Sequence, residues 1–301
     1  MSTRFTDPNI KRKREVLNTH LEAHHEQLDC PPLSLVEFNL TGLCNRTCEF
    51  CPRVDPEVFP NVDEEITLEL YEKILEDLRA VRFDGTILFS AFGEPLLHHR
   101  VEDLLRATRE RCPQARVEIV TNGDSLTAAK IVALFEAGLT ILAISMYDGA
   151  EQIETFSTMR RAAGIDESKV ILRKRYLPPE EHYGITLSNR AGTLTMEALG
   201  IRALDEPLTR PCHYPFYQFL VDHDGKVLLC PHDWGKQLVL GDLNEKSVAD
   251  IWNSLLLKRT RLGLAEGDRD FSPCRECDVD GTRMGKSHFV DWLEYYDAQH
   301  R

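Results

Sequence analysis

The chain has 301 residues, a length that fits one large α/β domain with a small appendage, since domains run from about 50 to 250 residues. Its 42% hydrophobic and 28% charged residues are ordinary for a globular protein and too polar for a membrane protein. The 36 basic and 49 acidic residues give a net charge of −13, which repels phosphate backbones and argues against a nucleic-acid partner. A neutral or cationic small-molecule substrate fits this charge better.

The sequence carries no targeting signal that we can identify. No apolar run approaches the roughly 18 residues of a transmembrane helix, and the first ten residues lack a signal-peptide core. We therefore expect a cytoplasmic protein without membrane contact. Cytosolic reductants keep thiols reduced, so the nine cysteines favour metal sites over disulfides.

Helix and strand patterns alternate along the first two thirds of the chain. An apolar strand at 33–40 runs into a cysteine-rich loop. We then predict helices at 67–81, 101–111, 127–137 and 151–163, and strands at 85–90, 117–121, 139–145, 170–176 and 185–188. Strands separated by helices of about ten to fifteen residues imply parallel βαβ units. About six strands are too few for a closed eight-stranded barrel, so the pattern predicts an α/β fold with a partial (β/α)6 TIM-like barrel.

The pattern changes after Pro211. Residues 216–221 and 226–229 are predicted to form a β-hairpin, because Asp224-Gly225 supplies the positive φ of a tight turn. A helix at 247–262 and a pair of cysteines follow. We place a boundary near residue 205, which divides the chain into a leader helix (1–33), the partial barrel (34–205) and a small C-terminal domain (206–301).

Three cysteines, Cys44, Cys48 and Cys51, lie in the loop directly after the first strand. Short spacings in one loop let several thiolates reach one iron–sulfur cubane, and three ligands leave the fourth iron open. Zinc is the alternative, although a structural zinc usually has four protein ligands. The spacing therefore favours a site-differentiated [4Fe–4S] cluster.

This loop resembles the hallmark of the radical S-adenosylmethionine superfamily, in which an aromatic residue precedes the third cysteine. Phe50 has that place. The resemblance implies that the open iron binds S-adenosyl-L-methionine and that a 5′-deoxyadenosyl radical abstracts a hydrogen atom from substrate. It also implies a flavodoxin- or ferredoxin-like electron donor.

The strand at 85–90 is followed by Ala91-Phe92-Gly93-Glu94-Pro95, which looks like the family's Gly-Gly-Glu-Pro motif. In the family this motif contacts the methionyl amine, so Gly93 and Glu94 are expected to bind S-adenosylmethionine. Phe92 replaces the first glycine. Ligands of parallel α/β sheets bind at the carboxyl ends of strands, which is where this motif falls.

Later strand ends offer three more candidates for S-adenosylmethionine. The resemblance implies that Asn122, Ser145 and Arg173 hold its ribose hydroxyls and carboxylate, and the planar fork of arginine suits a carboxylate. For Asn122 and Ser145, hydrogen bonding to turn backbone is an equally good interpretation.

Four more cysteines occur in the C-terminal part: Cys212, Cys230, Cys274 and Cys277. They supply a complete ligand shell for a second [4Fe–4S] cluster or for a structural zinc, and spacing alone does not decide between them. The arrangement resembles the twitch form of the SPASM extension, which implies an auxiliary cluster. Because all its irons would be ligated by cysteine, such a cluster could not bind substrate. Its possible roles are electron transfer and structural support.

Together these features predict a radical oxidoreductase that dehydrogenates an alcohol carbon of a sugar, cyclitol or aminoglycoside-like molecule. The spacing of the four C-terminal cysteines resembles that of 2-deoxy-scyllo-inosamine dehydrogenase-type enzymes. Cys30 and Cys112 precede strands and should lie opposite the active face, which disfavours an epimerase that needs a thiol near the substrate. A peptide-modifying radical enzyme or epimerase, and a zinc-stabilised binding protein, are the alternatives. The sequence does not identify a catalytic base.

Overall fold

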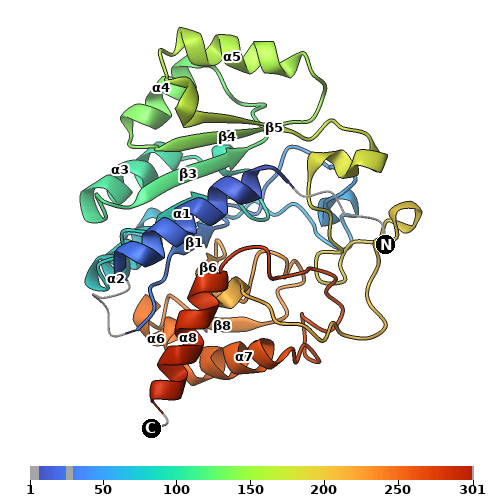
Figure 1. Cartoon of the computed structure of the whole chain (residues 1–301). Coiled ribbons are helices and arrows are strands. Elements are labelled where there is room, and N and C mark those ends of the chain that lie inside the picture. The colour runs from blue at the N-terminus through green and yellow to red at the C-terminus, as the bar shows by residue number, and fades with distance from the viewer. Residues whose placement is uncertain (1–6, 25–29, 300–301) are drawn as a thin grey trace.

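The computed structural model describes residues 7–24 and 30–299, which form an α/β fold around one sheet (Figure 1). Neighbours from β5 to β6 pair in parallel, and β6, β7 and β8 are antiparallel, in the order β5-β4-β3-β2-β1-β6-β7-β8. The predicted fold class is thereby confirmed. The strands are β1 (Leu35–Phe38), β2 (Thr86–Phe89), β3 (Arg116–Thr121), β4 (Ile141–Met146), β5 (Val170–Lys174), β6 (Gln218–Val221), β7 (Lys226–Leu228) and β8 (Val239–Asp242).

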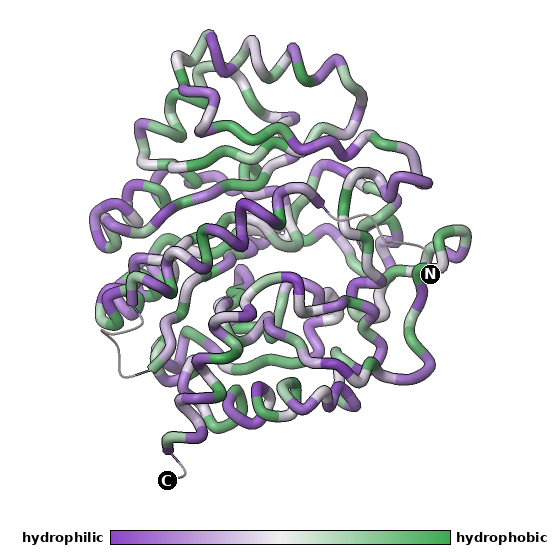
Figure 2. The backbone as a smooth tube through the Cα atoms, in the orientation of Figure 1, coloured by the Kyte–Doolittle hydropathy of each residue, from purple (hydrophilic) through white to green (hydrophobic). Residues whose placement is uncertain are grey.

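Helices join the parallel strands and cover one face of the sheet (Figure 1). Side chains alternate along each strand, so Val36 and Phe38 of β1 pack in the core formed with these helices, whereas Leu35 and Glu37 face the opposite side. The central strands are correspondingly hydrophobic (Figure 2). The α-helices are α1 (Asn9–His24), α2 (Leu68–Ala80), α3 (Val101–Arg111), α4 (Ala128–Glu136), α5 (Gln152–Ala162), α6 (Val248–Trp252), α7 (Leu255–Glu266) and α8 (Lys286–Ala298).

The face of the sheet opposite α2 to α5 carries polar side chains and is covered by α1. A cavity of about 250 Å³ lies between them. Arg12 of α1 donates two hydrogen bonds of 2.8 Å to Glu118 of β3. Burial by itself would raise the pKa of Glu118. Hydrogen bonds and charge attraction from Arg12 and Arg116 outweigh the effect of burial and lower this pKa to about 2. Charge pairing thus holds α1 against the sheet.

Two sequence predictions are wrong in detail. Residues 185–188 form no strand. A 3-10 segment at Pro179–Gly184 precedes them, and β5 is left as an edge strand of the sheet. The helix predicted at 247–262 is two helices, because Ser254 has an extended backbone and accepts a hydrogen bond from the Leu257 amide, starting α7 anew. Strand β8 and helix α8 were not predicted.

The C-terminal part of the chain continues the sheet of the N-terminal part, since β6 pairs with β1 from Leu35 opposite Gln218 onward. The boundary near residue 205 remains a prediction. In the part of the chain that the structure describes, no helix has the length and apolar character needed to cross a bilayer.

Candidate active site and metal centres

The first cysteine loop begins directly after β1 and is held by short local contacts. The Cys51 amide donates to the Cys48 carbonyl at 3.0 Å, and a 3-10 turn, Pro52–Val54, follows. At the Cys44 end of the loop, the Asn61 side chain accepts a hydrogen bond from the Cys44 amide and donates one to the Cys44 carbonyl, both at 2.9 Å. These local hydrogen bonds hold both ends of the cysteine loop.

The three thiols of this loop lie within electrostatic reach of one another. Burial, followed by the neighbouring Cys51 and Cys44, raises the pKa of Cys48 to about 12. Burial likewise raises the pKa of Cys44 and of Cys51. A cation among these sulfurs would lower the pKa of the thiols again, because it favours the thiolate forms that ligate metals. The donor set thus fits a thiolate-bound metal centre.

Arg53 joins the cysteine loop to the loop after β2, and sequence reasoning missed it. The side chain is 4% exposed. It donates to the carbonyls of Phe92 at 2.7 Å and Gly42 at 2.9 Å, and to Asn61 at 2.6 Å. One buried guanidinium therefore holds three backbone segments in register. In the sequence, only its position two residues after Cys51 could have pointed to this role.

The Gly-Glu-Pro loop packs tightly against the cysteine loop. A Cβ on Gly93 would lie 2.1 Å from the Thr41 carbonyl oxygen, so only glycine fits. Glu94 is buried and accepts hydrogen bonds from the Asn122 amide at 2.8 Å and the Thr121 hydroxyl at 2.7 Å. Burial raises its pKa in spite of these donors. Phe92, at the place of the family's first glycine, packs on Trp234 with ring centroids 4.9 Å apart.

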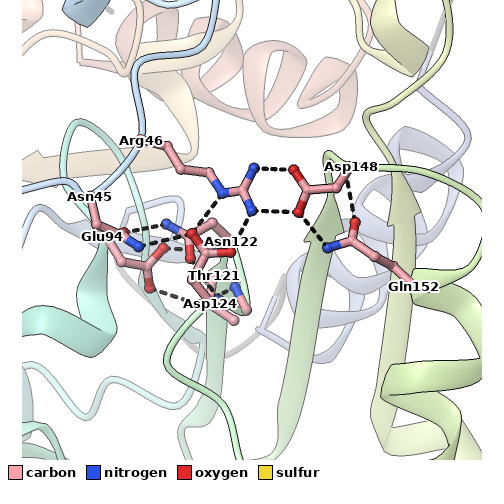
Figure 3. A network of polar contacts seen from close by, with 9 residues as sticks. Asn45, Arg46, Glu94, Thr121, Asn122, Asp124, Asp148 and Gln152 are labelled. Carbon is pink, nitrogen blue, oxygen red and sulfur yellow. Dashed lines mark hydrogen bonds and ion pairs between the residues drawn. The ribbon is translucent and has the colours of Figure 1, made fainter.

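A charged network lies over the carboxyl ends of β3 and β4 (Figure 3). Arg46, between Cys44 and Cys48, donates to Asp124 and to both oxygens of Asp148 at 2.7 Å, which raises the pKa of the guanidinium. Asn122 donates to Asn45 of the same loop at 2.6 Å. The cysteine loop is therefore fastened to two strand ends by residues that the sequence did not single out, with the exception of Asn122.

The other predicted cofactor residues lie around this loop. Phe50 packs between Tyr147, with ring centroids 6.1 Å apart, and Tyr183, at 4.9 Å. Ser145 is buried and lies opposite Arg173 on β5. The guanidinium of Arg173 lies 3.2 Å from the carboxylate of Asp7, so it is paired with a carboxylate of the same chain.

The second cysteine set is organised by a buried arginine. Arg269 is 2% exposed and donates to four carbonyls, two before Cys212 and two after Cys277. A Cβ on Gly281 would lie 2.7 Å from the Cys212 sulfur. Burial raises the pKa of Cys277 to about 12, and burial followed by the other three thiols raises the pKa of Cys230 well above its ordinary value. The four cysteines thus face one another.

The spacing of the sulfurs can be compared with the geometry of a zinc site. Tetrahedral zinc, with Zn–S bonds of about 2.3 Å, holds its sulfurs about 3.8 Å apart. Across residues 7–24 and 30–299, the His, Cys, Asp and Glu group whose ligand atoms all lie within 4.8 Å of one another is His20, His24 and Asp84. Neither cysteine set is that compact.

Arg190 lies between the two cysteine sets. Its charge offsets part of the rise that burial causes in the pKa of Cys51 in the first set, and it contributes, after burial, to lowering the pKa of His232 to about 3. Its Nε is buried without a hydrogen-bond partner in the described chain. His232 contacts Ser188 at 3.2 Å and Tyr214 at 3.1 Å and lines both the 250 Å³ cavity and a neighbouring one of about 320 Å³.

Two histidines after the Gly-Glu-Pro loop and two further cysteines make other contacts. His98 is buried with Nε2 on the Ile66 carbonyl at 2.9 Å, and His99 is exposed and contacts Glu65. Cys112 is buried in the core before β3, and Cys30 precedes β1, both at the amino edge of the sheet. Neither thiol lies at the carboxyl ends of the strands.

Comparison with known proteins agrees with these centres. Residues 38–174 match the family described as the Radical SAM superfamily, and residues 212–278 match SPASM, an iron-sulfur cluster-binding domain. An S-adenosyl-L-methionine-dependent 2-deoxy-scyllo-inosamine dehydrogenase of Niallia circulans is 31% identical over 245 residues, 81% of this chain and 92% of that protein. The chain belongs to the radical S-adenosylmethionine superfamily. The family prediction is therefore confirmed, and the alternative prediction of a zinc-stabilised binding protein is wrong.

Further relatives support the same assignment. The crystal structure of BtrN in complex with AdoMet and 2-DOIA superposes with a TM-score of 0.69 at 28% identity, covering 85% of this chain and 97% of that one. A GTP 3',8-cyclase of Synechococcus sp. (strain CC9902) is 32% identical over 44% of this chain and 36% of its own length. This radical SAM enzyme binds S-adenosylmethionine and two iron–sulfur clusters, as predicted.

Proposed function

We propose that this enzyme dehydrogenates an alcohol carbon of a sugar, cyclitol or aminoglycoside-like molecule, with an amine-bearing cyclitol as the first candidate. The observation that carries the proposal is the 31% identity to a 2-deoxy-scyllo-inosamine dehydrogenase, which spans 81% of this chain and 92% of that protein. The net charge of −13 suits a substrate that carries an ammonium group.

We assign the first cluster to Cys44, Cys48 and Cys51 and the second to the four C-terminal cysteines. When bound, S-adenosylmethionine and the first cluster supply hydrogen-atom abstraction, and the second cluster supplies a one-electron acceptor. The mutual electrostatic reach of the thiols in each set supports this assignment. A flavodoxin- or ferredoxin-like protein is the proposed source of the starting electron.

The protein's own residues position the cofactor. Gly93 allows the loop after β2 to approach the cysteine loop, and Glu94 orients the Asn122 amide beside it. We assign Gly93, Glu94 and Asn122 to the methionyl and ribose groups. Phe50, Ser145 and Arg173 are assigned to the same ligand, and Arg173 would exchange its bond with Asp7 for one with a ligand carboxylate.

Substrate is proposed to bind between the two cysteine sets. Arg190 has an unpartnered, buried Nε there, which can donate to a substrate hydroxyl and so hold the reacting carbon in place. Tyr214 and His232 line the same space, and burial keeps His232 neutral by lowering its pKa to about 3. The two adjoining cavities share these side chains, and their limited volumes favour a single small ring over a peptide.

The test is anaerobic incubation of the reconstituted enzyme with reductant, S-adenosylmethionine and one candidate substrate at a time. With 2-deoxy-scyllo-inosamine we expect 5′-deoxyadenosine together with a ketone two mass units lighter than the substrate. An inositol without the amine is the matched comparison and should react at least about tenfold less. A failure to oxidise any cyclitol, combined with modification of a peptide, would overturn the proposal.

A further inference from the structure

We infer that His20, His24 and Asp84 form a binding site for one Zn²⁺ ion at the amino edge of the sheet, away from both cysteine sets. Their three ligand atoms all lie within 4.8 Å of one another. His20 and His24 are one helical turn apart on α1, with stacked rings 4.5 Å between centroids. Asp84 precedes β2, so the site joins a helix to the sheet.

The carboxylate of Asp84 offers one oxygen to each imidazole. His20 Nε2 lies 2.9 Å from Oδ1, and His24 Nε2 lies 3.0 Å from Oδ2. Ligand bonds of about 2.1 Å in a tetrahedron separate two ligand atoms by about 3.4 Å. Small side-chain rotations would therefore admit the ion between atoms that already converge on it.

The second ring nitrogen of each histidine is already fixed. His24 Nδ1 lies 2.8 Å from the His20 carbonyl oxygen, which only accepts, so this nitrogen carries the hydrogen. In neutral His24 the lone pair on Nε2 then faces the Asp84 carboxylate, an arrangement of two acceptors that calls for a proton or a metal ion between them. Backbone carbonyls commonly orient metal-ligating histidines in this way.

His20 is held from behind by a buried chain of side chains. Its Nδ1 lies 2.7 Å from the Ser34 hydroxyl, which is 2.6 Å from Nε2 of His288 in α8. Ser34 and His288 are fully buried, and the Ser34 amide donates to the Tyr217 carbonyl at 3.1 Å. The serine hydroxyl can reverse its direction, and an ion at His20 Nε2 would select the one in which Ser34 accepts from His20 Nδ1 and donates to His288 Nε2.

The site also has access and room for a further ligand. A cavity of about 240 Å³ is lined by His20, His24 and Asp84 together with Cys30. Zinc with three protein ligands keeps a fourth position for water, and this cavity provides the space. Two imidazoles and one carboxylate are donors that zinc accepts well. The bound ion would fasten the end of α1, the helix that covers the polar face of the sheet.

The test uses the anaerobic holoprotein with both clusters loaded, washed with EDTA, incubated with Zn²⁺ and desalted. Elemental analysis should find about one zinc and still about eight iron per chain. The His24→Ala and Asp84→Asn variants should keep the iron and lose the zinc. His99→Ala is the matched control, because His99 contacts Glu65 at 3.0 Å but belongs to no such group within residues 7–24 and 30–299, and it should keep both metals.

X-ray absorption at the zinc edge of the unmutated holoprotein makes the test independent of whether the variants fold. We expect only nitrogen and oxygen ligands, at about 2.0–2.1 Å. A single sulfur would be attributable to Cys30, which lines the same cavity. Two or more sulfur ligands at about 2.3 Å would show that zinc had entered a cysteine set, which would overturn the inference. So would a holoprotein with full iron content that takes up no zinc, or zinc uptake unchanged in both variants.

Discussion

Arg53 donates from Nε to the carbonyl oxygen of Phe92 at 2.7 Å, and this buried bond connects the cysteine loop after β1 with the Gly-Glu-Pro loop after β2. The two loops carry the residues assigned to the first cluster and to the methionyl group. Arg53 therefore helps to set their relative position, together with the bond from the Glu94 amide to the Leu43 carbonyl at 2.8 Å, without itself needing to touch either cofactor.

The Arg53→Lys variant should show how much this bond matters. Lysine is a point donor and cannot replace the fork that reaches Phe92, Gly42 and Asn61 at once. We expect turnover to fall by about tenfold or more, with iron lost from the first centre, because buried carbonyls lose charged donors worth about 1.5–3 kcal/mol each. Arg79→Lys, on the exposed side of α2, is the control and should behave like the unmutated enzyme. Full activity in Arg53→Lys would contradict this role.

The two cysteine sets should be separable by mutation. Cys48→Ala should reduce iron from about eight to about four per chain and abolish 5′-deoxyadenosine formation. Cys230→Ala should also lower the iron content but should still cleave S-adenosylmethionine while forming little ketone. Iron analysis and chromatography of the products distinguish the two. If Cys48→Ala retained turnover, the assignment of the first cluster would be wrong.

The Gly93→Ala variant tests the close approach of the two loops. Its Cβ would lie 2.1 Å from a backbone oxygen that cannot rotate away, so the loops must separate. Binding of S-adenosylmethionine should weaken by about tenfold or more, because loop displacements of about 1 Å disrupt positioned ligands. Gly263→Ala in α7 is the matched control, since its Cβ would meet nothing closer than 3.9 Å. That variant should gain up to about 1 kcal/mol in stability.

The pairing of Glu118 with Arg12 predicts a pH dependence of stability. The folded pKa of about 2 lies below the ordinary value of 4.5, so the unfolded chain binds the proton first as the pH falls. The contribution, about 3 kcal/mol, is complete above pH 4.5 and lost between there and about pH 2. Denaturant unfolding of the unmutated protein and Glu118→Gln should therefore differ most at neutral pH. An equal difference at pH 7 and pH 2.5 would contradict this reading.

Much of the fold followed from local sequence patterns. The helices and strands from 67 to 176 lie within two residues of their predicted bounds, because the periodicity of apolar side chains reflects contacts made by neighbours on one helix or strand. The prediction of a strand at 185–188 used the same pattern of apolar residues and was wrong. An apolar segment there packs Ile185 and Leu187 against Phe50 without pairing with β5, and the sequence alone cannot distinguish these two environments.

The sequence by itself determined the chemistry, since three cysteines in one loop and four in the C-terminal part restrict which metal centres are possible. Only the tertiary structure decided how the loops are held and what covers the sheet. Arg46 and Asp148 are 102 residues apart, and Arg12 and Glu118 are 106 apart. Ion pairs of this kind leave no periodic trace in a chain, because they depend on which strand ends and helices the completed fold brings together.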